Sequence, residues 1–359
     1  MRNRIIGIAL GALLGVIMIA WRAERSAAPA WNILPENSGA IRTVAFQYTR
    51  DSSRVTWGCI AEFLRQVSHE VEIIAICGTN DDADDLRSAI ARLGINPQHV
   101  RVVVVGEPIT GWCKDRFLVA DGSIKSLLLP IQPAVSSSAR LNDSLSARAV
   151  SGAFPKRFRV IRTSFHFDAG DILATEDSVI VSEVLFRKND NLPDLAGEIE
   201  RLCGRKVLVL HDVPEHHIGM FAAPLDKGVV VVGDPDIAKG IWTDKISRQL
   251  GKADFSDRAV KPFLNAAYQL RAAGMHVVRV PTAYIEPQVY ITYTNGVFET
   301  RGGKRIAYVP CYNVPELDEA AFNAYRNAGW EVKPIHVGSV YKYRGTIGCL
   351  INVLERSEY

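Results

Sequence analysis

One junction between a helix and a strand recurs along the chain and constrains its fold more than any other feature. In each copy, apolar residues at helical spacing lead to an arginine, a few small or apolar residues and then a glycine, after which a β-rich run begins. A cation suits the C-terminal end of a helix dipole, and glycine readily takes the left-handed conformation that turns the chain into a strand. The copies are Arg92–Gly94 before Val100–Val105, Arg201–Gly204 before Val207–Leu210, Arg271–Gly274 before Val277–Val280, Arg326–Gly329 before Glu331–Ile335 and, with serine in place of glycine, Arg65–Ser68 before Val71–Cys77.

Five copies of one junction predict an α/β fold built from a repeated supersecondary unit. A doubly wound parallel sheet would contain such junctions too, but the chain has no GxGxxG motif after its first strand and no P-loop. The candidate functional residues follow different copies of the repeat, which is expected where repeated units converge on a central axis. We predict that this domain spans residues 41–359.

The N-terminal region differs from the rest of the chain. A basic start at Met1–Arg4 precedes an uncharged apolar run over Ile5–Trp21, and Ala28–Ala30 has the small-x-small form of a signal-peptidase site. We interpret residues 1–30 as a hydrophobic helix that is either a cleaved signal peptide or a membrane anchor through residues 5–21, and 31–40 as a linker. The arginines before the apolar run then stay on the cytoplasmic side of the membrane. We therefore expect an exported domain, periplasmic or membrane-anchored.

Composition excludes other classes of function. The 359 residues are 48% hydrophobic and 23% charged, as in a folded globular protein, and the net charge of +3 does not indicate a nucleic-acid partner. The six cysteines have no CxxC or Cys/His spacing typical of zinc, and no acidic loop has EF-hand spacing. We therefore expect neither a metal nor a cofactor. Disulfides remain an open alternative for an exported protein.

Carboxylates stand out in two segments. Asp115 follows Trp112 after the Val100–Val105 run, and Asp168 and Asp171 lie three residues apart within the apolar segment Phe165–Leu173. Carboxylates in such apolar surroundings are costly unless they face a cation, although a capping or turn role is the alternative for each segment.

A histidine and a cysteine complete the set of candidates. His217 enters the small and apolar segment Ile218–Ala223, where a buried core histidine is the alternative reading. Cys349 follows Gly345 and Gly348, which allow a close backbone approach at the end of a strand. By itself Cys349 would read as a small buried hydrophobe.

Together these motifs resemble the pentein superfamily of guanidino-group-modifying enzymes. The resemblance covers about residue 45 to the C-terminus and rests on four motifs in the order typical of the family: Trp112-x-x-Asp115, Phe167–Leu173, His217-Ile218-x-x-Phe221 and Gly345-x-x-x-Cys349-x-x-Asn352-Val353. The family includes agmatine, arginine and peptidyl-arginine deiminases, dimethylarginine hydrolases and amidinotransferases. It implies a five-bladed, pseudosymmetric ββαβ propeller.

The resemblance also implies roles for single residues. Cys349 matches the nucleophile of the family and His217 its acid/base histidine, while Asp115 and Asp168 match carboxylates that bind the guanidinium group. The remaining matches are substrate-binding residues: Trp112, Asp171, Arg187, Gly348 and Asn352. Arg187 resembles an arginine that holds a substrate carboxylate, with the local spacing offset by one residue.

The implied reaction is hydrolysis at a guanidino carbon through a covalent thiouronium on Cys349, giving a ureido product and ammonia or an amine. An amidinotransferase using the same intermediate, or a pentein that binds without turnover, are the alternatives. Gly219 stands where the family often has a second aspartate clamp, Lys114 where an arginine is common, and Gly348 where a histidine is common. The substrate, free or peptidyl, therefore stays open.

Overall fold

A computed structural model describes residues 32–122, 125–130, 142–286 and 288–357 of the chain. The predicted signal peptide or anchor over residues 1–30, with its hydrophobic helix, lies outside these residues. Within the described part, no helix is both long and apolar enough to span a bilayer.

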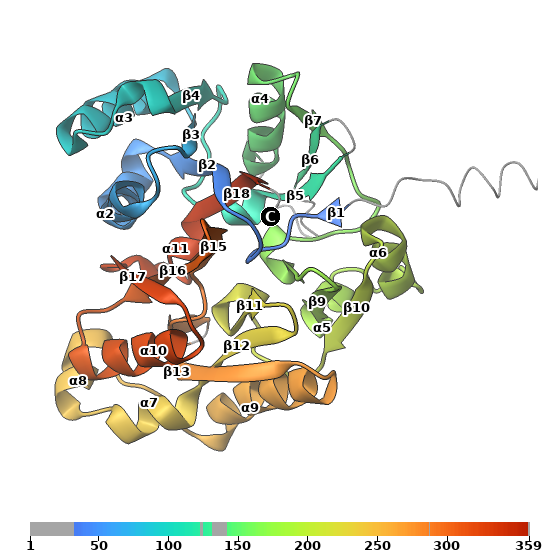
Figure 1. Cartoon of the computed structure of the whole chain (residues 1–359), viewed down its shortest axis with the longest axis vertical. Helices are drawn as coiled ribbons and strands as arrows, with labels where there is room; N and C mark the ends of the chain where they lie inside the picture. Colours follow the sequence, from blue (N-terminus) through green and yellow to red (C-terminus); the bar gives the residue numbers. More distant parts are fainter. Residues whose placement is uncertain (1–31, 123–124, 131–141, 287, 358–359) are drawn as a thin grey trace, which may run out of the picture.

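The strands of the described residues form five separate small sheets (Figure 1). Their strand orders, with the bounds of each strand, are β1(Asn32–Ile33)-β5(Phe117–Asp121)-β6(Ser126–Pro130)-β7(Phe158–Val160), β10(Lys206–Leu210)-β9(Ser178–Ser182)-β8(Ile172–Ala174), β11(Ala222–Asp226)-β12(Val229–Asp234)-β13(His276–Glu286)-β14(Val289–Thr292), β15(Val297–Arg301)-β16(Lys304–Cys311)-β17(Glu331–His336) and β18(Ile351–Arg356)-β2(Ile41–Tyr48)-β3(Glu72–Cys77)-β4(Val100–Val104).

Each sheet contains the same connection. An antiparallel pair is followed by a parallel third strand, as in β15, β16 and β17 or in β18, β2 and β3. A parallel neighbour requires a crossover, and helices supply it. These crossover helices are α2 (Arg50–Gln66), α4 (Leu145–Ala153), α5 (Glu183–Arg187), α6 (Leu195–Cys203), α7 (Pro235–Ile241), α8 (Asp244–Leu250), α9 (Asp257–Ala272) and α10 (Pro315–Asn327). Helix α3 (Asn80–Leu93) connects β3 to β4, and α11 (Ile347–Leu350) precedes β18.

The predicted helix–strand junctions are confirmed. Gly94 and Gly204 cap α3 and α6 with φ of 68° and 61°, and Gly274 and Gly329 follow α9 and α10 with φ of 88° and 83°. In every case the β-rich run behind the junction is a strand. Glycine adopts a positive φ more readily than other residues, which explains why it occupies these junctions.

The copies do not map one to one onto the sheets, which corrects the repeat count. The junctions at Ser68 and Gly94 lead into β3 and β4 of the same sheet. The sheet of β5, β6 and β7 has no such junction, because α4 ends at Ala153, and its C-cap residue Phe154 is followed by Pro155. Proline cannot continue a helix, so it ends α4 without a glycine.

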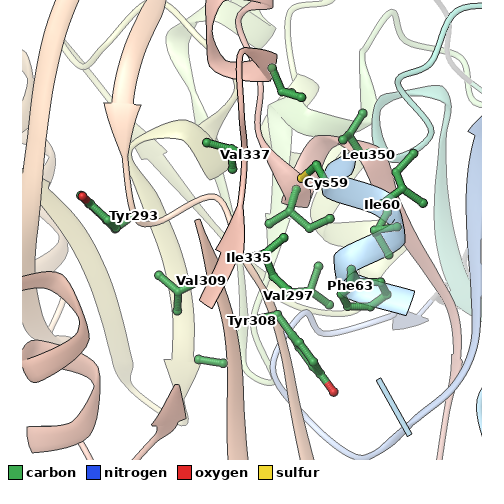
Figure 2. Close-up of a cluster of buried hydrophobic side chains, with 14 of the residues drawn as sticks. Cys59, Ile60, Phe63, Tyr293, Val297, Tyr308, Val309, Ile335, Val337 and Leu350 are labelled. Carbon is green, nitrogen blue, oxygen red and sulfur yellow. The ribbon is translucent and has the colours of Figure 1, made fainter. Parts of the chain in front are cut away.

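The largest core cluster lies where several sheets meet α2. Figure 2 shows Cys59, Ile60 and Phe63 of α2 against Val297, Tyr308 and Ile335 of the sheet β15–β16–β17. The rings of Phe63 and Tyr308 pack edge to face with centroids 5.0 Å apart. Burial of this apolar face supplies the main stabilisation of the helix.

Part of the predicted linker 31–40 packs against the domain. Asn32 and Ile33 pair antiparallel with β5, and Ile33 is buried. Leu34 N donates to Val119 O at 2.9 Å. Within the described part of the chain, all six cysteines are free thiols, and all except Cys311 are buried.

Candidate active site

The candidate residues occupy equivalent places in the repeated units. Short helical turns lie before the first strand of the antiparallel pair described above in four sheets: η2 (Lys114–Arg116) before β5, η4 (Ala169–Asp171) before β8, η5 (Ile218–Met220) before β11, and α11 before β18. Asp115 lies in η2, Asp168 and His217 are the N-cap residues of η4 and η5, and Cys349 lies in α11. Segments far apart in sequence therefore contribute one residue each to a common site.

His217 lies between two carboxylates. Its Nδ1 is 3.3 Å from Asp115 Oδ1, and its Nε2 is 3.9 Å from Asp168 Oδ2. All three side chains are largely buried, which strengthens charge interactions between them. The three side chains form a connected acid/base group.

The charges of this group shift its pKa values in opposite directions. Burial alone would lower the pKa of His217, but the Asp115 carboxylate raises it well above its usual value. Burial alone would raise the pKa of Asp115, but His217 holds it below its usual value. An imidazolium paired with a carboxylate is therefore the resting state near neutral pH.

Cys349 lies next to this pair. The thiol is 3% exposed and its Sγ is 3.2 Å from Asn295 Oδ1. Burial and the nearby Asp115 charge raise the pKa of Cys349, while the neighbouring His217 acts against them. The resting sulfur is thus a thiol that a cation beside it would help to ionise.

Sequence reasoning missed Asn295. It lies two residues before β15, which begins the antiparallel pair of the remaining sheet, β15–β16–β17. This place is equivalent to those of the predicted residues in the other four sheets. The Asn295-Gly296 dipeptide between two β-rich runs is a turn signal that could have drawn attention to this residue.

Sequence reasoning also missed Lys188. Its Nζ lies 3.0 Å from Asp168 Oδ2 and 2.5 Å from Asp171 Oδ2. Burial would lower the pKa of Lys188, but Asp171 and Asp168 raise it above its usual value. The cation that Asp168 and Asp171 were expected to face is therefore this lysine of the chain itself.

Three of the predicted substrate-binding residues have other partners. Asp171 is 2% exposed and accepts from Asp168 N at 2.8 Å in addition to Lys188. Arg187 pairs with Glu183 and Glu215 on an exposed surface, and the next residue, Lys188, lines the cleft in its place. Asn352 is buried and donates to Phe117 O at 2.9 Å, which ties β18 to the start of β5.

Two cavities meet at His217 and Asp115. The entrance cleft, lined among others by Trp112, Asp168 and Lys188, has a volume of about 470 Å³. The inner cavity has a volume of about 20 Å³ and is lined by Cys349 and Gly348 as well as by His217 and Asp115. Trp112 packs on Gly345, where a Cβ would lie 2.5 Å from the indole ring. Gly348 N donates to Asn295 O at 3.0 Å.

The second histidine of the segment is neutral. Burial and the neighbouring His217 lower the pKa of His216 to about 3, and His216 Nδ1 accepts from His217 N at 2.7 Å. No group of three or more potential metal ligands occurs within the described ranges.

Gly170 allows the close approach of η4 to His217. Gly170→Ala is expected to reduce the rate of the catalysed reaction about 10²-fold, because a small displacement of a reacting group has a cost of that order. An added Cβ would lie 2.5 Å from His217 Cγ and Nδ1, and 2.9 Å from Asp115 Oδ1. Gly58→Ala in α2 is the control, since a Cβ there meets nothing within 4 Å. Steady-state kinetics check this, and equal rates for the two variants would contradict it.

Solved structures share this fold. No protein-family model matches the chain, and no curated protein matches its sequence. The agmatine deiminase of C. jejuni superposes with a TM-score of 0.69 at 14% identity, covering 92% of this chain and 98% of that one. An agmatine deiminase of Enterococcus faecalis gives a TM-score of 0.67 at 13% identity, covering 91% and 96%. The chain therefore has the pentein fold, which it shares with these deiminases.

Proposed function

We propose that this protein is a hydrolase of a guanidino compound and that Cys349 is its nucleophile. The convergence of Cys349, His217, Asp115 and Asp168 from equivalent turns of the repeat carries the proposal. The fold shared with agmatine deiminases supports it. The five sheets, each with the same ββαβ connection, support a five-bladed propeller whose axis runs through this site.

The carboxylates bind the substrate. Asp115 and Asp168 accept charge-assisted hydrogen bonds from the planar guanidinium and fix its orientation. Trp112 forms a wall of the entrance cleft through which the group enters. The positive charge of the substrate also lowers the pKa of the Cys349 thiol, so binding itself favours the nucleophilic thiolate.

The reaction proceeds in two steps. The Cys349 thiol loses its proton to solvent once the cationic substrate is bound, and the sulfur forms a bond to the guanidino carbon. The C–N bond then breaks as His217 donates a proton to the departing nitrogen, which leaves as ammonia or an amine. In the second step His217 takes a proton from water, the water oxygen bonds to the same carbon, and the C–S bond breaks. The products are a ureido compound and the free cysteine.

A colorimetric assay for ureido product tests this proposal. Arginine, agmatine, methylated arginines and arginyl peptides are compared, each with and without glycine or lysine as an amine acceptor. Ureido product and released ammonia or amine from one of these substrates support the hydrolase. A transferred amidino group would instead identify an amidinotransferase, and no product from any of them would contradict the proposal.

One observation favours a pentein that binds without turnover. The Lys188 ammonium already neutralises Asp168, one of the proposed guanidinium clamps, and Gly219 provides no side chain as a second clamp. A cationic substrate must then share or displace the lysine. The assay above separates this alternative from the hydrolase.

Lys188→Gln is expected to lower the KM for a guanidinium substrate about tenfold, since one competing charge-assisted contact on Asp168 is removed. Lys188→Arg keeps the cation and is the matched control, with a KM close to that of the wild type. Initial-rate kinetics measure both. A KM that rises in Lys188→Gln would show that the ammonium assists binding and does not compete.

We also propose that the domain works outside the cytoplasm, on the basis of the basic and apolar leader over residues 1–30. Cell fractionation with an antibody to the domain tests this. Recovery of the full-length protein in the soluble cytoplasmic fraction would contradict it.

A further inference from the structure

The carboxamide of Asn295 lies against the sulfur of Cys349 and is enclosed by two glycines. A Cβ at Gly219 would lie 2.8 Å from Asn295 Nδ2, and a Cβ at Gly348 would lie 3.0 Å from the same atom. These are two of the positions at which the sequence departs from the family pattern. Both departures therefore leave room for one side chain, which is 7% exposed.

The hydrogen bonds of Thr346 define how the carboxamide is oriented. The Thr346 hydroxyl is 2.7 Å from the main-chain oxygen of Asn295 and also 2.7 Å from its side-chain Oδ1. A hydroxyl has one proton, so it can donate to one of these oxygens only. The second contact would bring two oxygens together without a proton between them.

A rotation of the carboxamide by 180° resolves this contact. The oxygen and nitrogen of an amide have nearly the same shape, and the hydrogen-bond network decides which end is which. With the NH2 group in the position of Oδ1, one N–H donates to the Thr346 hydroxyl and the other points at Cys349 Sγ, 3.2 Å away. In the unrotated orientation, Nδ2 has no hydrogen-bond partner among the described residues.

We propose that the NH2 group of Asn295 donates a hydrogen bond to the sulfur of Cys349 and stabilises its thiolate. The inference rests on the proposed role of Cys349 as nucleophile. A hydrogen bond to an anion favours the charged form and is stronger than one between neutral groups. Asn295 would thus supply, with a neutral amide, part of the stabilisation that the buried sulfur needs.

Charged groups also face this sulfur from other elements. His217 at η5 lowers the thiol pKa and Asp115 of η2 raises it. Asp168 of η4 acts through His217, and the ion pair of Lys114 and Glu36 lines the inner cavity. All of these groups remain when Asn295 is replaced. A change in the titration of Cys349 in that variant is therefore attributed to the loss of the Asn295 carboxamide.

The pH dependence of Cys349 alkylation by iodoacetamide tests the proposal. The modified Cys349 peptide is quantified by mass spectrometry in the wild type and in Asn295→Ala. Loss of a donor to the thiolate is expected to raise the alkylation midpoint by about one pH unit. If the carboxamide oxygen accepts from the thiol instead, its loss lowers the midpoint. A lowered or unchanged midpoint would overturn the proposal.

Two checks keep the result interpretable. Thermal unfolding establishes that Asn295→Ala is folded, and Asn295→Ser, which retains one small donor, carries the test with a smaller upward shift if it is not. Alkylation does not require turnover of a guanidino compound. A raised midpoint in a protein that turns over no guanidino substrate would therefore uphold this inference while the proposed function fails.

Discussion

Cys349→Ser is expected to reduce formation of ureido product by at least about 10³-fold, because a serine hydroxyl is far less nucleophilic than a thiolate in the same place. The replacement is nearly isosteric, and the carbonyl oxygen of Asn295 still fixes the turn through Gly348 N. The melting temperature should therefore stay close to that of the wild type. Initial rates and thermal unfolding measure the two quantities.

Cys203→Ser is the matched control for this experiment. Cys203 is also a buried free thiol, but it lies at the end of α6 in a core cluster that does not contain the site residues Cys349, His217, Asp115 and Asp168. Its replacement is expected to cost some stability and to leave the rate per folded enzyme unchanged. A Cys349→Ser enzyme that retains a tenth of the wild-type rate would exclude Cys349 as the nucleophile.

Asp115→Asn is expected to lower kcat/KM by about 10²- to 10⁴-fold, the range over which acid/base groups and their orienting partners act. The change removes the charge that holds His217 as an imidazolium and one of the proposed guanidinium clamps. Without that charge, the burial of His217 remains and its pKa falls. A smaller fraction of the histidine then carries a proton to donate near neutral pH.

The pH profile gives the sign of this effect. Since the pKa of His217 is raised in the wild type, the limb of the profile that reports loss of its proton is expected to move to lower pH in Asp115→Asn. Asp318→Asn is the control, as Asp318 is equally buried but bonds Tyr293 and Tyr312. An unchanged profile in Asp115→Asn would show that Asp115 does not set the protonation of His217.

Local patterns predicted the elements of this fold well. The junctions at Gly94, Gly204, Gly274 and Gly329 depend on helix ends and on the φ of single residues, which neighbouring sequence determines. The sheet that contains β7 was not recognised as a repeat, because the proline after Phe154 ends α4 in a different way. A repeat that is defined by one capping residue is not recognised in the sequence wherever a different residue ends the helix.

The site was predictable to the extent that its residues stand in recognisable motifs. Asp115, Asp168, His217 and Cys349 converge, although no spacing within one segment links them. Asn295 and Lys188 were missed because their importance lies in contacts across the repeat, with Cys349 and with Asp168. Such contacts depend on tertiary packing, which a single sequence does not reveal.

The central claim is that Cys349 forms a bond to the guanidino carbon, and mass spectrometry of the enzyme during turnover tests it most directly. The protein is quenched in acid while it acts on the substrate that the ureido assay identifies. We predict a fraction of the protein with the mass of the substrate less one ammonia or amine added on the Cys349 peptide, and no such fraction in Cys349→Ser. Steady turnover with Cys349 unmodified at every time point, or with the added mass on another residue, would contradict the account.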